Sequence, residues 1–216
     1  MASRILTIVL LGLVAGSVVL TPRIKDQRLP GNQQGYEPPQ PLAFSHRQHA
    51  GDLQISCAYC HFAAEKSQHA GLPSASLCMN CHRFVTATWD ATFAEYLKSL
   101  RVNKPPRPVV SAELAKLFDS LGLNSQLQQN PAKRPMPIPW VKVHNLPAYV
   151  RFDHRAHVHA GVKCQRCHGE VEKMDKVRQV EDLSMGWCVD CHREPEQMDA
   201  ASQPLQPSTD CAVCHF

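Results

Sequence analysis

One short pattern occurs five times in this chain: two cysteines separated by two residues and followed at once by a histidine. On a helical turn, positions i, i+3 and i+4 lie on one face, so one turn can present both thiols and the imidazole together. That arrangement suits a porphyrin, because the two thiols reach the two vinyl groups on one edge while the imidazole reaches the iron. The spacing is the attachment signature of c-type haem. The five copies, numbered motifs 1 to 5 in chain order, contain the cysteines Cys57, Cys60, Cys78, Cys81, Cys164, Cys167, Cys188, Cys191, Cys211 and Cys214 and the histidines His61, His82, His168, His192 and His215.

Two other uses of paired cysteines fit this pattern less well. Structural zinc sites usually combine two such pairs into four ligands, and an odd number of pairs, each followed by histidine, does not divide in that way. A disulfide scaffold is compatible with ten cysteines outside the cytoplasm, but a tight Cys-x-x-Cys loop suits redox exchange better than a structural crosslink. All ten cysteines belong to the five motifs. We therefore predict five covalently bound c-type haems, each with its motif histidine as one axial ligand.

The composition indicates a fold built around cofactors rather than around a large side-chain core. The 216 residues include 17 prolines, and only 6% are aromatic. We expect a mainly α fold with short helices, much irregular loop and few or no strands, in which the haems supply most of the buried apolar surface. The net charge of +4 is mild, and no basic cluster with interleaved aromatic residues indicates nucleic-acid binding.

An uncharged apolar run from Ile5 to Leu20 follows Arg4 near the amino terminus. Its length lies between that of a signal-peptide core and that of a full membrane-spanning helix. Because haem is attached to such motifs outside the cytoplasm, the chain needs an export signal. We expect residues 1–24 to remain as a transmembrane anchor that holds the rest on the periplasmic side of a bacterial inner membrane; cleavage as a signal peptide is the alternative.

Composition and motif spacing divide the rest of the chain into four parts. Residues 25–42 are rich in proline, glycine and glutamine, which is typical of an extended tether. A two-haem module is predicted at 43–103 and a three-haem module at 140–216. A proline-rich linker with one short helix, 104–139, separates the two modules.

Two amphipathic helices are predicted between motifs 2 and 3. The first runs from Thr88 to Arg101, and we expect its apolar stripe to pack on a haem or a neighbouring helix. The second begins near Ser111, a suitable N-cap, inside the linker. The stripes consist of Trp89, Phe93, Tyr96, Leu97 and Leu100 in the first helix and of Leu114, Leu117, Phe118 and Leu121 in the second.

The two modules share an internal repeat, because the pattern Phe-x-His-x-x-His precedes motif 1 at residues 44–49 and motif 3 at residues 152–157. A haem whose motif histidine is bound has one further axial position, for which histidine is a common ligand. Two neighbouring histidines cannot both fill that position, so each pair should serve two different haems. The candidate distal ligands are His46, His49, His69, His144, His154 and His157, whereas His159 breaks the i, i+3 pairing and is expected not to be a ligand.

Methionine is the other candidate for a distal position, and it raises the haem potential relative to a second histidine. Met174 lies between motifs 3 and 4, roughly where His69 lies in the first module, and Met185 lies three residues before Cys188. Most buried methionines simply fill space in a core, so ligation and packing are both open for these residues, with Met174 the first choice. A single haem of higher potential would suit an exit point for electrons.

The pattern Phe-x-His-x-x-His followed by Cys-x-x-Cys-His resembles the trihaem cytochromes c7 and the related tetrahaem cytochromes c3. The resemblance implies c7/c3-like modules in which the first histidine ligates the haem of the next motif and the second reaches a later haem. His46 would then ligate the haem of motif 1 and His154 that of motif 3. His49 and His157 would ligate other haems.

The C-terminal half carries a more specific resemblance. Its run of Trp140-Val-Lys-Val-His144-Asn-Leu-Pro, the second Phe-x-His-x-x-His, motif 3 and Leu183-Ser-Met-Gly-Trp-Cys188 is similar to the pentahaem cytochrome subunit of bacterial alternative complex III. The resemblance implies an electron-transfer subunit of a quinol:cytochrome c or oxidase-linked oxidoreductase, not an enzyme by itself. It also implies three kinds of partner: an iron–sulfur subunit, a monohaem cytochrome c subunit and polytopic quinol-binding membrane subunits. Related quinone-reducing complexes use similar parts in the opposite direction.

Two other function classes fit less well. A multihaem reductase needs an iron with an open site, often marked by an altered motif, whereas all five motifs here are intact and candidate ligands outnumber the irons. A free periplasmic carrier of the c7 type, with a cleaved signal, is the alternative to a complex subunit. The long proline-rich linker and the apolar start favour the subunit.

Overall fold

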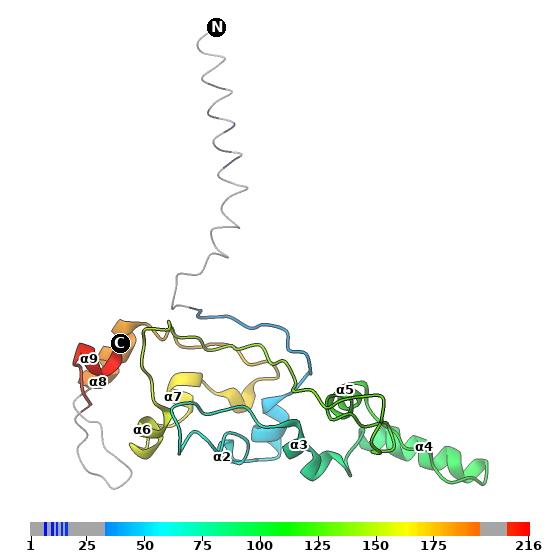
Figure 1. Ribbon diagram of the computed structural model, residues 1–216. Helices are drawn as coiled ribbons and strands as arrows, with labels where there is room; N and C mark the ends of the chain where they lie inside the picture. Colours follow the sequence, from blue (N-terminus) through cyan, green and yellow to red (C-terminus); the bar gives the residue numbers. More distant parts are fainter. Residues whose placement is uncertain are drawn as a thin grey trace.

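The computed structural model describes residues 33–194 and 207–216, together with residues 7, 10, 12, 14 and 16. Short helices joined by long irregular segments make up the fold (Figure 1). Within the described residues, β structure is limited to two isolated bridges, Leu123 with Gln129 and Val150 with His215. The prediction of a mainly helical fold with much irregular loop is therefore confirmed. In chain order the elements are η1 (Arg47–Asp52), α2 (Cys57–Cys60), α3 (Ala75–His82), α4 (Trp89–Arg101), α5 (Ala112–Ser120), α6 (His154–His159), α7 (Gln165–His168), η2 (Val171–Lys173), α8 (Met185–Arg193) and α9 (Cys211–Cys214).

The predicted anchor at 1–24 lies outside the described residues apart from five isolated positions, as do residues 25–32 of the predicted tether. Among the residues that the structure does describe, no helix has both the length and the apolar character needed to cross a bilayer. The described end of the tether lies along the C-terminal half of the chain. The Gly35 amide donates to the carbonyl of Gln179 at 2.7 Å, and the Gln179 amide donates to the carbonyl of Tyr36 at 3.0 Å.

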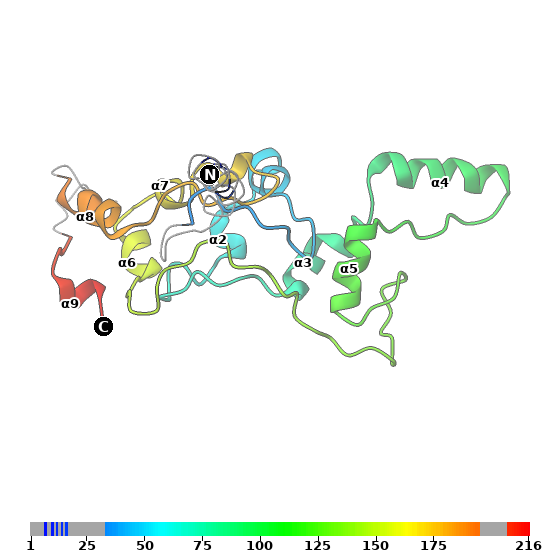
Figure 2. The same cartoon turned by 90° about the horizontal axis from the view of Figure 1, so that it is seen from above.

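Helices α4 and α5 begin where the sequence predicts, because a side chain caps each of them. The Thr88 hydroxyl accepts from the Ala91 amide, and the Ser111 hydroxyl accepts from the Leu114 amide. Both predicted helices are confirmed. Together they form an arm that extends from one end of the molecule (Figure 2).

The apolar stripe of α4 does not pack on a neighbouring helix, which corrects that part of the prediction. Trp89 is 76% exposed and Leu100 is 59% exposed. The physical reason is the position of α4, which extends beyond the rest of the chain instead of folding back onto it (Figure 2). The other stripe residues, Phe93, Tyr96 and Leu97, are also exposed.

The two haem-motif modules contact one another through reciprocal hydrogen bonds. The Arg47 amide at the start of η1 donates to the carbonyl of Met174, which follows motif 3, at 2.9 Å. In the opposite direction, the His154 amide at the start of α6 donates to the carbonyl of Gln68, which follows motif 1, at 3.2 Å. The loop after the first motif of each module thus holds the histidine-bearing helix of the other.

The side-chain core is small and lies mainly away from the motifs. Among the described residues, the buried hydrophobic side chains are Leu117 and Phe118 on α5 and Val143 in an extended segment. A core of this size removes little apolar surface from water, and apolar burial is the main favourable contribution to folding. This agrees with the expectation from composition that side chains alone do not form the core.

Candidate functional site

Each Cys-x-x-Cys-His motif forms or ends a short helix, as the shared-face argument requires. Motif 1 forms α2, motif 2 ends α3, motif 3 lies on α7, motif 4 lies within α8 and motif 5 forms α9. Side-chain caps fix two of these helices: the Ser184 hydroxyl accepts from the Trp187 amide on α8, and the Asp210 carboxylate accepts from the Ala212 amide on α9. All ten cysteines lie among the described residues, and no disulfide joins any of them.

Three motif histidines face a second imidazole at a similar spacing. An imidazole nitrogen binds a transition metal at about 2.0–2.1 Å, and the ring centre lies about 1 Å behind it, so two imidazoles on opposite sides of one ion have centres about 6 Å apart. These pairs come from segments far apart in the sequence, so tertiary structure brings them together. The pairs and the distances between their ring centres are His49 with His82 at 6.1 Å, His154 with His168 at 6.3 Å and His157 with His192 at 6.1 Å.

Most of these imidazoles also carry the hydrogen bond that prepares a histidine to bind a metal. A carbonyl oxygen can only accept, so an Nδ1 beside it carries the proton and leaves the Nε2 lone pair for a metal. Six histidines place Nδ1 within 3 Å of a backbone carbonyl. They are His49 at Ser45, His61 at Gly71, His82 at Val85, His154 at Gln68, His157 at Asp153 and His192 at Ser208.

The repeated phenylalanine orients the two histidines that follow it. Phe44 stacks on His49 at 4.3 Å and meets His46 edge-on at 4.9 Å. In the second module, Phe152 makes the same two contacts, at 4.5 Å with His157 and at 4.9 Å with His154. The sequence repeat is therefore also a structural repeat. Sequence reasoning did not assign the phenylalanines to the site, although their recurrence at a fixed offset was the available signal.

His46 lies beside motif 1 in a half-buried position. Burial lowers the pKa of His46 to about 4, and the nearby His61 and then His49 lower it further. Its Nδ1 is buried and has no hydrogen-bond partner. In the internal repeat, His46 and His61 occupy the positions that correspond to His154 and His168.

His144 lies behind the motif 3 histidine. Its Nε2 is 3.4 Å from Nδ1 of His168, and the two rings are 4.4 Å apart and nearly perpendicular. Burial lowers the pKa of His168 to about 3, with a further contribution from His144. Burial and the nearby His154 lower the pKa of His144 to about 4. Both imidazoles are therefore neutral near pH 7, and the 3.4 Å contact places the two ring nitrogens within hydrogen-bond distance of one another.

The remaining candidates lie apart from these pairs. His69 and His159 are both exposed. Met174 is half-buried over η1, where its carbonyl accepts from Arg47. Met185 begins α8 and is 68% exposed. Beside motif 5, the ring of Tyr149 lies 5.9 Å from that of His215, a neighbour that sequence reasoning missed.

The five cysteine pairs follow one another in space in an order that differs from the sequence. Both views show α3, α2, α7, α8 and α9 in succession along the body, which is the order of motifs 2, 1, 3, 4 and 5 (Figures 1 and 2). Neighbouring thiols agree with that order. Burial is the main cause of a raised pKa for four of the thiols, and a thiol of an adjacent motif raises each pKa further. Cys60 acts on Cys78, Cys57 on Cys164, Cys191 on Cys167, whose pKa rises to about 11, and Cys214 on Cys188.

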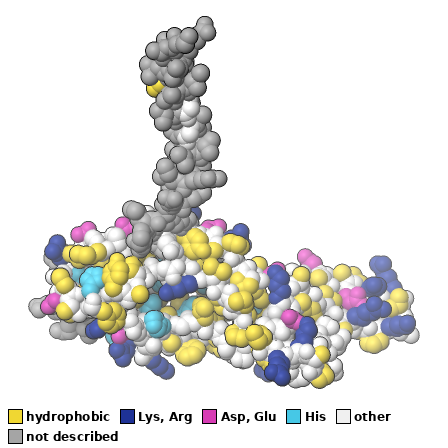
Figure 3. Space-filling view, turned by 45° about the horizontal axis from the view of Figure 1, so that its top comes forward, with side chains coloured by type: hydrophobic (Ala, Val, Ile, Leu, Met, Phe, Trp, Pro, Cys, Tyr) yellow, Lys and Arg dark blue, Asp and Glu magenta, His cyan; other side chains and the backbone are white. Residues whose placement is uncertain are grey.

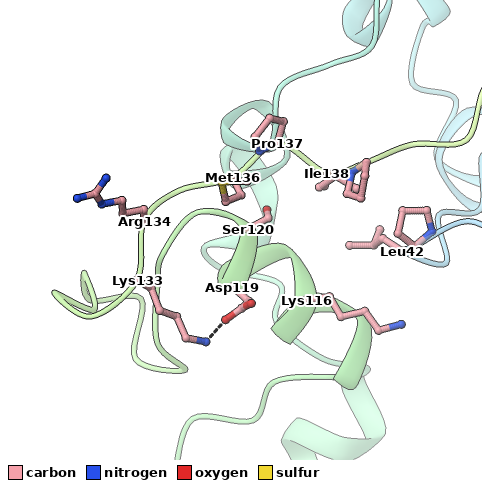
Figure 4. Close-up of a pocket in the computed structure, with 11 residues that line it drawn as sticks. Leu42, Lys116, Asp119, Ser120, Lys133, Arg134, Met136, Pro137 and Ile138 are labelled. Carbon is pink, nitrogen blue, oxygen red and sulfur yellow. Dashed lines mark hydrogen bonds and ion pairs between the residues drawn. The ribbon is translucent and has the colours of Figure 1, made fainter.

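The surface around the motifs combines apolar and histidine side chains. Figure 3 shows histidines among hydrophobic side chains on the body of the molecule, while lysines and arginines gather at the far end of the arm. A pocket of about 420 Å³ lies elsewhere, between α5 and residues 133–139, where Lys133 pairs with Asp119 (Figure 4). None of its lining residues belongs to a motif or is a candidate ligand. Among the described residues, no group of three or more His, Cys, Asp or Glu side chains is arranged to hold a metal ion directly.

The residues present fit c-type haem. Paired thiols stand on one helical face, the motif imidazoles present Nε2, and three of them face a second imidazole at the spacing of two axial ligands. The geometry fits that of a multihaem cytochrome c.

Comparison with known proteins agrees for the C-terminal part. Residues 150–216 match the family described as cytochrome c7 and related cytochrome c. A segment of 63 residues is 43% identical to the multihaem cytochrome c subunit of menaquinone reductase from Nitratidesulfovibrio vulgaris. That segment covers 28% of this chain and 30% of the relative. The similarity supports covalently bound c-type haem and a c7-like module in this part of the chain.

Proposed function

We propose that this chain is a pentahaem cytochrome c that relays electrons as a membrane-anchored subunit of a quinol-oxidising complex, of the alternative complex III type. Haem supplies reversible one-electron chemistry when bound, and the protein sets its potential through axial ligands, hydrogen bonds and burial. Five intact motifs would bind five haems, with one motif histidine as a ligand in each.

The observation that carries this proposal is the set of imidazole pairs about 6 Å apart. Each pair joins a motif histidine to one from a Phe-x-His-x-x-His segment. A bis-histidine iron has no open position, so the pairs favour electron transfer over a reaction at the metal. The proposed ligand pairs are His61 with His46, His82 with His49, His168 with His154 and His192 with His157.

The spatial order of the motifs supports a relay. Motifs 2, 1, 3, 4 and 5 form one continuous series, and the nearby Cys57 raises the pKa of the Cys164 thiol, after burial, where the two modules meet. Covalent attachment at such adjacent thiols would hold the edges of successive haems near one another. A series of this kind carries electrons from one end of the molecule to the other without a diffusing carrier.

Assembly with other subunits is part of the proposal. The curated relative is a subunit of a menaquinone reductase, which supports a place beside membrane subunits that exchange electrons with quinone. We propose the partners to be an iron–sulfur subunit, a monohaem cytochrome c and polytopic quinol-binding subunits. Residues 1–24 would anchor the chain in the inner membrane, with both modules on the periplasmic side.

The test is purification of the tagged chain from native membranes in mild detergent. Mass spectrometry of the chain should show five haem adducts, and polytopic and iron–sulfur subunits should co-elute. Added quinol should reduce the haems. A chain that elutes alone and is unresponsive to quinol would reduce the assignment to a free periplasmic carrier, and fewer than five adducts would overturn the pentahaem proposal.

A quinone-reducing complex is the second candidate, because the similar subunit belongs to a menaquinone reductase. The same preparation separates the two. In a quinol-oxidising complex, quinol reduces the haems and a c-type acceptor reoxidises them. In a quinone-reducing complex, haems that have been reduced chemically become oxidised when quinone is added.

A further inference from the structure

Motif 5 differs from the other four in its surroundings. All twelve histidines lie among the described residues. The ring described beside His215 is that of Tyr149, at 5.9 Å and tilted. Besides the five motif histidines there are seven others: His46, His49, His154 and His157 lie with motifs 1 to 4, His144 contacts His168, and His69 and His159 are exposed. Among the ring contacts of the described residues, His215 therefore has a tyrosine beside it and no second imidazole.

Met185 lies on α8, the helix that carries the adjacent motif 4. It is the first residue of α8 and precedes Cys188 by three positions, so both side chains lie on one face of the helix. The Cys188 thiol in turn lies near that of Cys214 in motif 5. Met185 is also 68% exposed, which is unusual for a methionine that serves only to fill a core.

Contacts between α8 and the start of α9 hold this arrangement in place. Nδ1 of His192 on α8 donates to the carbonyl of Ser208, three residues before α9, at 2.7 Å. The Arg151 amide donates to the carbonyl of Cys214 at 2.8 Å, which fixes the other side of motif 5. Both views show α8 and α9 at the same end of the body (Figures 1 and 2).

Met174, the other methionine with sequence support, lies near the opposite module. Its carbonyl accepts from Arg47 at the start of η1, beside motif 1. Motifs 1 and 3, which flank it, already have His46 and His154. Met174 therefore has no open position to fill, although the sequence alone ranks it ahead of Met185.

We infer that Met185 is the second axial ligand of the haem on motif 5. The inference rests on the proposed pentahaem function. A thioether sulfur is a soft ligand that raises haem potential relative to bis-histidine ligation. The motif 5 end of the series is then its high-potential terminus, where electrons collect before they leave the chain.

The test uses the full haem-loaded chain and two readouts that do not depend on turnover. Ferric haem with a thioether ligand gives a weak far-red absorption band, and a potentiometric titration resolves its higher potential. We expect both features in the unsubstituted protein. Met185→Leu should abolish the band and remove the highest-potential component, whereas Met185→His should restore a six-coordinate haem at lower potential.

Two matched variants act as controls. Met174→Leu and Met198→Leu, the latter in the segment outside the described residues, should both keep the band. The inference is overturned if Met185→Leu keeps the band, if Met198→Leu removes it, or if the unsubstituted protein has no band. The number of haem adducts is measured in every sample, so five haems without a thioether signal would reject this inference and leave the pentahaem proposal intact.

Discussion

Substitution of Gly51 by alanine is a direct test of the contact between the two modules. A Cβ at Gly51 would lie closer than 3.0 Å to the backbone carbonyl of Glu172, which belongs to the loop after motif 3. Ordinary contact begins at about 3.4 Å. Both partners are backbone, so neither can turn aside, and the segments would have to separate by at least about 0.5 Å.

Overpacking of this kind costs about 1–3 kcal/mol, which for a chain of this length corresponds to a fall in Tm of about 2–12 °C. The loss should be larger than for an isolated clash, because the same loop holds η1 through the bond from Arg47 to Met174. Thermal unfolding of the purified haem-loaded protein, followed by far-ultraviolet circular dichroism, measures it.

Gly186→Ala is the matched control. Gly186 also lies in a helix, but a Cβ there would meet its nearest neighbour, the Ser184 hydroxyl, at 3.8 Å. Alanine in place of a helical glycine adds about 0.5–1 kcal/mol of stability, so Gly186→Ala should leave Tm unchanged or raise it slightly. If Gly51→Ala behaves in the same way, the modules do not meet as described and the reciprocal contact is wrong.

Two further predictions concern charge and hydrogen bonding near the motifs. The Ser45 hydroxyl and, after it, Arg47 hold the pKa of Asp175 below its ordinary value. The ionised carboxylate therefore stabilises the folded protein at any pH above the ordinary pKa. That stabilisation is lost as pH falls through the lowered pKa of the folded state. Asp175→Asn should therefore lower Tm at neutral pH, and the difference should close as pH falls below the ordinary pKa of an aspartate; a gap that is constant with pH would contradict this. His144→Leu removes the hydrogen-bond partner of His168. The His168 imidazole should then donate less electron density to the haem iron, and the potential of that haem should rise. His144→Gln, which keeps an acceptor, should shift the potential less, and equal shifts would refute the role of the hydrogen bond.

Local features of this chain could be predicted from the sequence because they depend on neighbouring residues. The start of α4 follows from the Thr88 hydroxyl and the start of α5 from that of Ser111. The motif spacing places the cysteines and the histidine on one turn, and the shared Phe-x-His-x-x-His pattern predicts that the two modules orient their rings alike.

Features that depend on distant residues could not be predicted in the same way. Nothing in the sequence shows that His49 faces His82 or that the loop after motif 3 holds η1. The exposure of α4 has the same origin: an amphipathic stripe predicts a helix, but not whether this chain supplies the surface that covers it. The sequence ranked Met174 above Met185 as a candidate ligand only because of its position between motifs 3 and 4. The structure places the Met174 carbonyl beside Arg47 in the other module, which makes Met174 the weaker candidate.

The spatial order of the motifs follows from the internal repeat. Each module uses the loop after its first motif to hold the histidine helix of the other, so motifs 1 and 3 must meet at the centre. The second motif of each module then lies outward, with motif 2 at one side and motif 4 at the other. What the modules do not share lies at the ends: α4 and α5 extend beyond motif 2, and motif 5 adds a site beyond motif 4. The repeat therefore accounts for a continuous series, and the unshared parts make its two ends different from one another.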